Sequence, residues 1–156
     1  MLKRDYDQVC SIVRTLEVLG ERWTLLVIRD VFNGRRRFDQ IQENLGVARN
    51  VLSTRLARLV DEGILEKRAY QERPPRYEYF LTEKGLDLWP TLISMLHWGD
   101  RHLAEGDGPP MLVRHKQCGG LVDERGTCGE CGERLDARGA YTEYGPGAPV
   151  QWREAA

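Results

Sequence analysis

Apolar residues recur at helical spacing in the first part of the chain. Over residues 9–19 they fall mostly three or four positions apart, and Gly20 ends the run as a helix C-terminus would. Residues 23–32 are apolar on almost all sides, a pattern that fits either a buried strand or a buried helix. The length of this run and its place between two helical patterns favour a buried central helix.

Two shorter stripes of apolar residues follow, and a glycine separates them. The first covers residues 38–45, Gly46 interrupts it, and the second covers residues 48–62 with its apolar positions on one face. Gly63 ends the second stripe. Two short helices joined by a glycine-containing turn predict a helix-turn-helix, with residues 48–62 as its second helix.

From residue 64 to residue 81 the period changes to two, as in β-strands. Pro74 and Pro75 stand in the middle of this region, and because proline lacks the backbone N–H that a strand needs, one continuous strand is excluded. A β-hairpin with a projecting tip is therefore predicted. A hairpin directly after a helix-turn-helix is typical of a winged helix-turn-helix, so the predicted fold class is mainly α with a small β-hairpin wing (α+β).

A last long helix is predicted from Thr82, a good N-cap, to about Ala104. Its apolar residues cover more than the ~100° of helix surface that packing on one core requires, so the surplus predicts contact with a second copy of the chain. Glycines and prolines then mark residues 105–110 as a linker. We therefore expect a winged-helix and dimerisation domain over residues 1–105, and a linker with a Cys/His-rich tail over residues 106–156.

The charge distribution adds a candidate partner. The whole chain carries a formal net charge of −1, but the segment from Arg35 to Arg76 holds ten basic and six acidic residues. This local excess suits a surface that faces the phosphates of double-stranded DNA, and a solvated face of an ordinary domain gives the same count. No apolar run approaches the ~20 residues of a membrane helix and the first residues carry no export signal, so we expect a cytoplasmic protein without a membrane partner.

The second helix of a helix-turn-helix places its N-terminal residues in the major groove while its apolar face stays on the core. The outward positions of residues 48–62 are Arg49, Asn50, Ser53 and Thr54. Arg49 can bridge guanine O6 and N7, and Asn50 can bridge adenine N6 and N7. These two are the candidate base readers, and the alternative for each is an exposed polar residue or a phosphate contact.

Further basic residues are candidates for the DNA backbone. Arg73 and Arg76 at the hairpin can reach phosphate or a minor groove, although Arg76 can equally brace the hairpin. Arg36, in a run of three arginines, can neutralise flanking phosphate or belong to a solvated loop. Arg55 can touch phosphate or pair with an acid inside the fold.

Three cysteines and one histidine form a group in the tail. His115 and Cys118 make one pair, Cys128 and Cys131 make the second, and a glycine follows each pair. This spacing is typical of two facing zinc knuckles, so we predict a structural Cys3His zinc site in a small zinc-ribbon-like appendage. A metal-free glycine-rich hairpin and redox use of the Cys-x-x-Cys are the alternatives. Because four protein ligands leave no open position, we expect the site to hold the structure of the tail only.

Several ordered segments occur together between residues 6 and 104. They are Cys10, Thr15 to Asp30, Arg37 to Asp39, Leu52 to Leu59 with Gly63-Ile64, and Pro74 to Gly85 leading to Trp98-Gly99. In this combination the chain resembles the HxlR-type transcriptional regulators. The resemblance implies a homodimer built from the first and last helices, with the recognition helix and the wing on DNA. Where the family usually has a hydroxyl residue or proline at the start of the recognition helix, this chain has Ala48, which removes a cap worth about 1 kcal/mol.

The predicted function is sequence-specific, DNA-binding transcriptional regulation by a homodimer, with a small-molecule or redox effector left open. The resemblance places a redox sensor at Cys10 in some members, because a helix N-terminus lowers a thiol pKa; a small buried residue is the other interpretation. A protein-binding adaptor of a transcription complex, using the winged helix and the zinc ribbon, is the alternative function. No phosphate loop, carboxylate pair or Ser/His/Asp set stands in a supporting context, so an enzyme is not expected.

Overall fold

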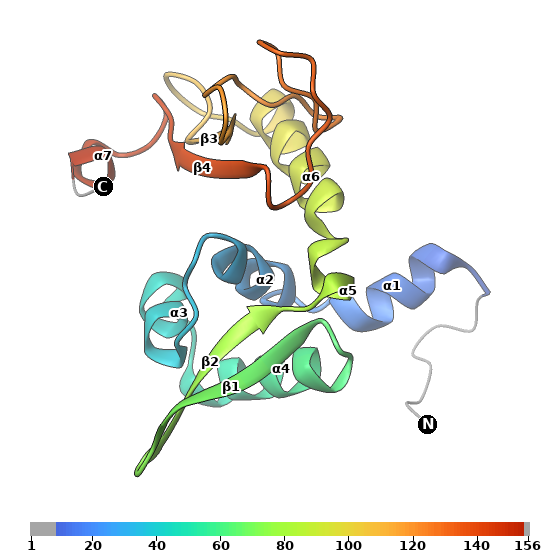
Figure 1. Ribbon diagram of the computed structural model, residues 1–156, viewed down its shortest axis with the longest axis vertical. Coiled ribbons are helices and arrows are strands. Elements are labelled where there is room, and N and C mark those ends of the chain that lie inside the picture. The colour runs from blue at the N-terminus through green and yellow to red at the C-terminus, as the bar shows by residue number, and fades with distance from the viewer. Residues whose placement is uncertain (1–8, 155–156) are drawn as a thin grey trace. The chain divides into compact units, whose positions relative to one another are not determined.

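The computed structural model describes residues 9–154 (Figure 1). The chain divides into two compact units, and the boundary along the sequence lies between Leu86 and Asp87. Each unit is described by itself. The first contains α1 (Ser11–Leu19), α2 (Thr24–Phe32), α3 (Phe38–Leu45), α4 (Arg49–Asp61), β1 (Leu65–Glu72), β2 (Pro75–Leu81) and α5 (Glu83–Leu86). The second contains α6 (Trp89–His102), β3 (Met111–His115), β4 (Ala140–Tyr144) and α7 (Val150–Glu154).

The core of the first unit lies between α2, α3, α4 and the start of β1. Its largest fully buried apolar side chains are Val27, Ile28, Ile41, Leu52, Leu56, Leu59 and Leu65. Residues 23–32, for which the sequence left strand and helix open, form a helix whose buried side chains contribute to this core. The predicted helix-turn-helix is confirmed as α3 and α4, which Gly46, Val47 and Ala48 separate.

The hairpin β1–β2 is the predicted wing. The two strands are antiparallel, with Leu65 opposite Leu81 at one end and Glu72 opposite Pro75 at the other, so the loop is only two residues long. The register shifts between Ala69 and Gln71, where a bulge leaves Tyr70 without a partner in the ladder. Within the first unit, Figure 1 shows the tip of this hairpin reaching well beyond α3 and α4. A mainly helical winged helix with a small antiparallel wing confirms the predicted fold class.

The single long helix predicted from Thr82 to Ala104 is wrong in one respect, because it is two helices. Thr82 caps the first of them, since its hydroxyl accepts the N–H of Gly85 at 3.1 Å. The chain then breaks at Asp87 and Leu88, and α6 starts at Trp89 with Pro90 in its first turn. A proline ring clashes with the carbonyl four residues earlier, so one helix cannot run unbroken through this point, whereas a first helical turn accepts proline.

The second unit joins α6 to the Cys/His-rich tail. Strands β3 and β4 pair antiparallel from Met111 opposite Tyr144 to His115 opposite Ala140. The buried apolar side chains of the tail are few and mostly small: Val113, Val122, Cys128, Leu135, Ala140 and Ala148. The sequence placed the last helix with the winged helix and set the boundary at residue 105, whereas the contacts of α6 within the described chain group it with the tail. Within residues 9–154, no helix combines the length and the apolar character needed to cross a membrane.

Candidate nucleic-acid interface and metal centre

The exposed face of α4 carries the candidate base-reading residues. Helix α4 begins at Arg49, directly after Ala48, whose backbone is extended and whose side chain makes no capping hydrogen bond. Leu52, Leu56 and Leu59 are buried, which turns the intervening residues outward. Arg49, Asn50, Ser53 and Thr54 are all exposed, as predicted.

Two of these exposed side chains already have contacts in the protein. The guanidinium carbon of Arg49 lies 4.8 Å from the centroid of the Phe38 ring, the first residue of α3. The Thr54 hydroxyl donates a hydrogen bond to the Asn50 carbonyl at 2.9 Å, one turn earlier in α4. The exposed amide of Asn50 and the exposed hydroxyl of Ser53 follow the stacked Arg49 in the first turns of α4.

Arg55 differs from the other arginines of α4. Its side chain is 17% exposed, and a guanidinium nitrogen lies 3.6 Å from a carboxylate oxygen of Glu21, in the turn before α2. The sequence left open a phosphate contact and a pairing with an acid inside the fold, and this geometry is that of the pairing.

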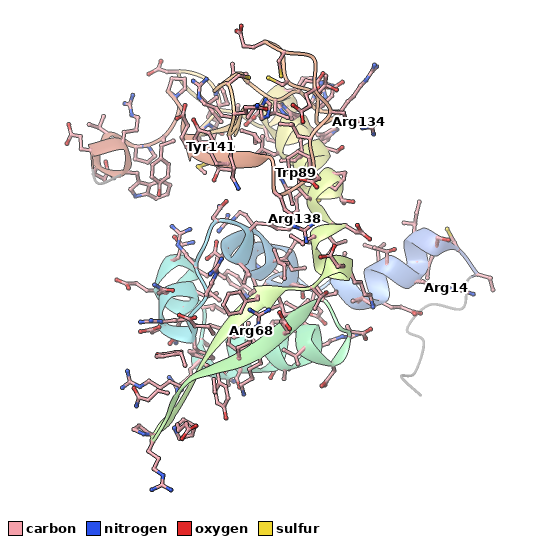
Figure 2. The ribbon with its side chains drawn as sticks, in the orientation of Figure 1. Arg14, Arg68, Trp89, Arg134, Arg138 and Tyr141 are labelled. Atoms are coloured by element: carbon pink, nitrogen blue, oxygen red, sulfur yellow. The ribbon has the colours of Figure 1, made fainter. Side chains whose placement is uncertain are left out.

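The wing carries basic side chains at its tip and along its strands. Arg73 and Arg76 are exposed, and neither side chain forms an ion pair within the part of the chain described here. Arg68, labelled in Figure 2, stacks on one aromatic ring with Arg36: their guanidinium carbons lie 4.3 and 4.5 Å from the centroid of Phe80. Cation–π contacts of this kind orient arginines without neutralising them, but Arg68 also forms an ion pair with Glu66 of the same strand, which compensates its charge.

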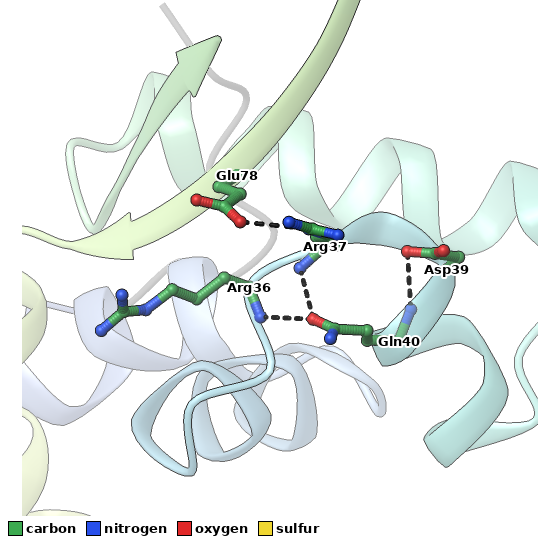
Figure 3. Close-up of polar contacts among 5 residues, drawn as sticks. All are labelled: Arg36, Arg37, Asp39, Gln40 and Glu78. Atoms are coloured by element: carbon green, nitrogen blue, oxygen red, sulfur yellow. Dashed lines mark hydrogen bonds and ion pairs between the residues drawn. The ribbon is translucent and has the colours of Figure 1, made fainter. Parts of the chain in front are cut away.

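Hydrogen bonds join the loop before α3 to the wing and hold the backbone of Arg36 in place (Figure 3). The backbone N–H groups of Arg36 and Arg37 both donate to the side-chain oxygen of Gln40, at 3.2 and 3.1 Å. Arg37 donates to the Glu78 carboxylate of β2 at 3.1 Å, and this hydrogen bond raises the pKa of Arg37. Because the Arg36 carbonyl also accepts the N–H of Tyr79 at 2.8 Å, this loop is held against the wing rather than solvated on all sides.

Sequence reasoning did not single out Arg68 for this surface, and it considered Arg37 only as part of the run of three arginines that can neutralise phosphate, not as a partner of the wing. Arg68 sits on β1 and stacks on a residue of β2, and Arg37 reaches Glu78 across forty-one positions of the chain. The signal in the sequence that could have indicated these contacts was the occurrence of basic and aromatic residues together in the hairpin. Lys67 is a further example, since its ammonium nitrogen lies 4.0 Å from the centroid of the Tyr77 ring.

Two matching turns bring the four tail residues together. In the first, the N–H of Gly119 donates to the carbonyl of His115 at 2.9 Å; in the second, the N–H of Gly132 donates to the carbonyl of Cys128, also at 2.9 Å. Both glycines have positive φ, 75° and 73°, which a residue with a side chain rarely adopts. The glycine after each ligand pair is thus required by the turn that aims both ligands of the pair to one side.

The four side chains form one cluster. The ligand atoms of His115, Cys118, Cys128 and Cys131 all lie within 4.8 Å of one another. Cys118 Sγ lies 3.4 Å from Cys128 Sγ and 3.2 Å from His115 Nδ1, and Cys131 Sγ lies 3.3 Å from the same nitrogen. Tetrahedral bonds of ~2.0–2.3 Å to zinc place neighbouring ligands roughly 3.5 Å apart, so the cluster has the size that such an ion requires.

The electrostatics of the cluster favour a bound cation. The backbone N–H groups of Cys131 and Glu130 lower the pKa of Cys128 to about 6, so this residue is a ready thiolate. The N–H of Gly120 acts to lower the pKa of Cys118, but its contacts with Cys128 and Cys131 and its desolvation outweigh that effect and raise it. A divalent cation removes this conflict, since it holds neighbouring thiolates together. The Glu133 carboxylate, 3.6 Å from His115 Nε2, can orient the imidazole with Nδ1 toward the metal.

Cys10 lies far from this cluster in sequence, at the N-cap of α1. It is exposed, so the interpretation as a small buried residue is wrong. The backbone N–H groups of Val13 and Ile12 lower the pKa of its thiol. An exposed thiol with a lowered pKa is chemically reactive.

Comparisons with known proteins agree with this architecture. A family model described as HxlR-like helix-turn-helix matches residues 18–107. The HTH-type transcriptional regulator Rv3095 of Mycobacterium tuberculosis is 46% identical over 137 residues, which is 88% of this chain and 87% of the relative. In a chain of 156 residues, a match of that length extends beyond the winged helix into the tail.

Solved structures give the same result. The transcription factor PA1607 is 32% identical with a TM-score of 0.69, over 85% of this chain and 92% of that one. The redox regulator HypR in its reduced form is 29% identical with a TM-score of 0.56, over 59% of this chain and 92% of that one.

Proposed function

Because the chain belongs to the family of HxlR-like helix-turn-helix proteins, we propose that it regulates transcription by binding specific DNA sites as a homodimer. The observation that carries the proposal is the exposed polar start of α4 next to a basic wing. An α-helix with such a face fits the major groove, while a basic hairpin contacts the flanking backbone or minor groove. We assign the protein no catalytic activity, and we place its action in the cytoplasm.

Each candidate residue has a role in this proposal. Arg49 and Asn50 read base edges, and Ser53 and Thr54 contact bases or phosphate from the next turn of α4. Three arginines outside α4 serve the DNA backbone, namely Arg36, Arg73 and Arg76. Arg55 contributes by holding α4 against Glu21 and reaches phosphate only if that pair opens.

Exposed apolar side chains on two helices support the homodimer. On α1 and just before it, Val9, Ile12 and Leu16 are 83%, 70% and 47% exposed. On α6, Met95 and Trp98 are 50% and 56% exposed. Apolar residues that repeat along helices and remain in water mark an interaction surface, and a second copy of the chain is the partner that family membership supports. The apolar pattern of this helix predicts Trp89, Leu92 and Leu96 as anchors of the dimer. Trp89 is only 6% exposed in the chain and is excluded, whereas Leu92 and Leu96 are half-buried.

We further propose that the Cys/His cluster holds one structural zinc ion. The support is the matched pair of turns, the ligand distances and the thiolate at Cys128. A redox effector acting at Cys10 is a narrower proposal, supported by its exposed, acidified thiol and by the similarity to the redox regulator HypR.

A band-shift assay with the DNA upstream of the gene for this chain tests the function. We expect a discrete complex that survives an excess of nonspecific competitor, together with a dimer in sedimentation of the protein alone. Binding that the competitor abolishes on every upstream fragment tested would contradict sequence-specific regulation and favour a protein-binding adaptor.

A further inference from the structure

Helix α6 has two unlike faces. Trp89, Ile93 and His97 follow one another at intervals of four and lie on one side, where Trp89 and Ile93 are 6% and 5% exposed. Met95 and Trp98 lie on the opposite side and are exposed. The helix is therefore held from one side by its own unit and offers its other side to a partner.

The element that holds α6 is the loop 122–126, between the two cysteine turns. His97 Nε2 lies 3.0 Å from the carbonyl oxygen of Val122 and donates a hydrogen bond to it in the corresponding tautomer. Arg101 forms an ion pair with the Glu124 side chain. These contacts follow α6 for a full turn along the side that carries Trp89.

A close approach of backbone to ring completes the contact. Gly126 is buried, and a Cβ at this position would lie 3.1 Å from Cζ3 of Trp89. The Trp89 ring therefore rests on the backbone of the loop itself. Packing of this kind lasts only while the loop keeps its shape.

The shape of the loop depends in turn on the metal cluster. Its start is fixed by the N–H of Val122, which donates to Val113 of β3 at 2.9 Å, and by a bridge between Val122 and Cys128. Its end lies two residues before Cys128, and the carbonyl of Gly126 accepts the N–H of Leu135 at 2.8 Å. With so few apolar side chains in the tail, these hydrogen bonds need a further constraint, and four ligands on one ion supply it.

We propose that metal bound by His115, Cys118, Cys128 and Cys131 controls the order of α6, with Trp89 and His97 as the positioning residues that link loop to helix. The inference rests on the proposed zinc site. It departs from the expectation that zinc holds the tail alone. Since the exposed face of α6 serves the proposed dimer, loss of zinc weakens self-association and, through it, binding to a two-part DNA site.

Hydrogen exchange of the full chain, read peptide by peptide with zinc bound and after removal by a chelator under reducing conditions, tests the link. We expect peptides of α6 (Trp89–His102) to exchange about tenfold faster or more without zinc, while peptides of α4 keep their rate. Zinc added back should restore the slow exchange. If zinc is shown to be lost and the exchange rate of α6 does not change, the inference is overturned, while the proposal that the cluster binds zinc still stands.

Substitutions at the contact between α6 and the loop test the link in zinc-loaded protein, so this test does not depend on whether the metal-free chain stays soluble. In zinc-loaded protein, His97→Ala should speed exchange in α6 without lowering zinc content, because it removes the bond to Val122 and touches no metal ligand. Alanine itself favours helix, so faster exchange cannot come from a lower helix propensity. His97→Gln keeps a donor and should restore protection. His102→Ala, a matched change on the opposite face, should leave the rate unchanged.

Metal content, measured first, separates the two proposals. A zinc content near zero overturns both the zinc site and this inference. Full zinc content allows the second comparison. If His97→Ala then changes the exchange rate of α6 by the same factor in zinc-loaded and zinc-free protein, the role of His97 is purely local and its role as a link is overturned. A larger effect in loaded protein supports it.

Discussion

The guanidinium of Arg49 lies over the ring of Phe38, so the first residue of the recognition helix is stacked on the first residue of the helix before it. The stack restrains the guanidinium while Arg49 remains exposed at the surface. An arginine oriented in this way loses less conformational entropy when it meets guanine than one that moves freely in water.

Arg49→Ala should therefore relax sequence preference at one base pair in each half-site, by ~1–3 kcal/mol, because alanine cannot form the two hydrogen bonds to guanine. Competition binding against operators with single base changes measures this. Equal losses on specific and random DNA would remove Arg49 from base reading.

Arg73→Ala should weaken binding to all DNA sequences alike, because the exposed tip of the wing meets the backbone. The slope of log affinity against log salt should fall by about one, as expected when one fewer phosphate is neutralised by the protein. A changed base preference with an unchanged salt slope would contradict this role.

Trp98→Glu should turn the dimer into a monomer while each chain stays folded, since its side chain is more than half exposed and its removal leaves no cavity. Sedimentation velocity at micromolar concentration gives the oligomeric state. Val150→Glu, at an equally exposed apolar position outside α6, is the control and should remain dimeric. A wild-type chain that sediments as a monomer would refute the dimer.

Protein purified without added zinc should contain about one zinc ion per chain, and Cys128→Ser should lower that content strongly, because it removes a ligand whose lowered pKa favours the thiolate. Limited proteolysis should then cut residues 111–145 while α2, α3 and α4 stay intact. An ordered, protease-resistant tail with no metal would show that the cluster is a glycine-rich hairpin only.

Cys10 should react with iodoacetamide at a lower pH than an ordinary thiol. Its folded pKa is lowered, so at any pH below the ordinary value a larger fraction is thiolate, and the rate falls off only as the pH drops through the lowered pKa. Mass spectrometry of zinc-loaded protein over a pH series measures this, with Cys10→Ser as the blank. A rate profile equal to that of a thiol in an unfolded peptide would leave the redox proposal without its chemical basis.

Local pattern was enough for much of the molecule. Helical periodicity located α1 to α4 within two residues, because each buries one stripe of side chains, and the two prolines located the wing. The ligand spacing located the Cys/His cluster, because two residues between ligands and a glycine after them define a turn by themselves.

Contacts between distant residues were decided by the tertiary structure alone. Periodicity showed that α6 carries surplus apolar surface, but only the fold divides it into a side on loop 122–126 and a side left exposed. The pairing of Arg55 with Glu21 and the stacking of Arg36 and Arg68 on Phe80 join segments that no local rule connects. The sequence by itself determined where apolar residues recur, and so where each helix and the wing lie, because that follows from spacing. Which of those residues are buried, and which partner each one meets, depends on how the elements pack, and that is decided by the whole chain.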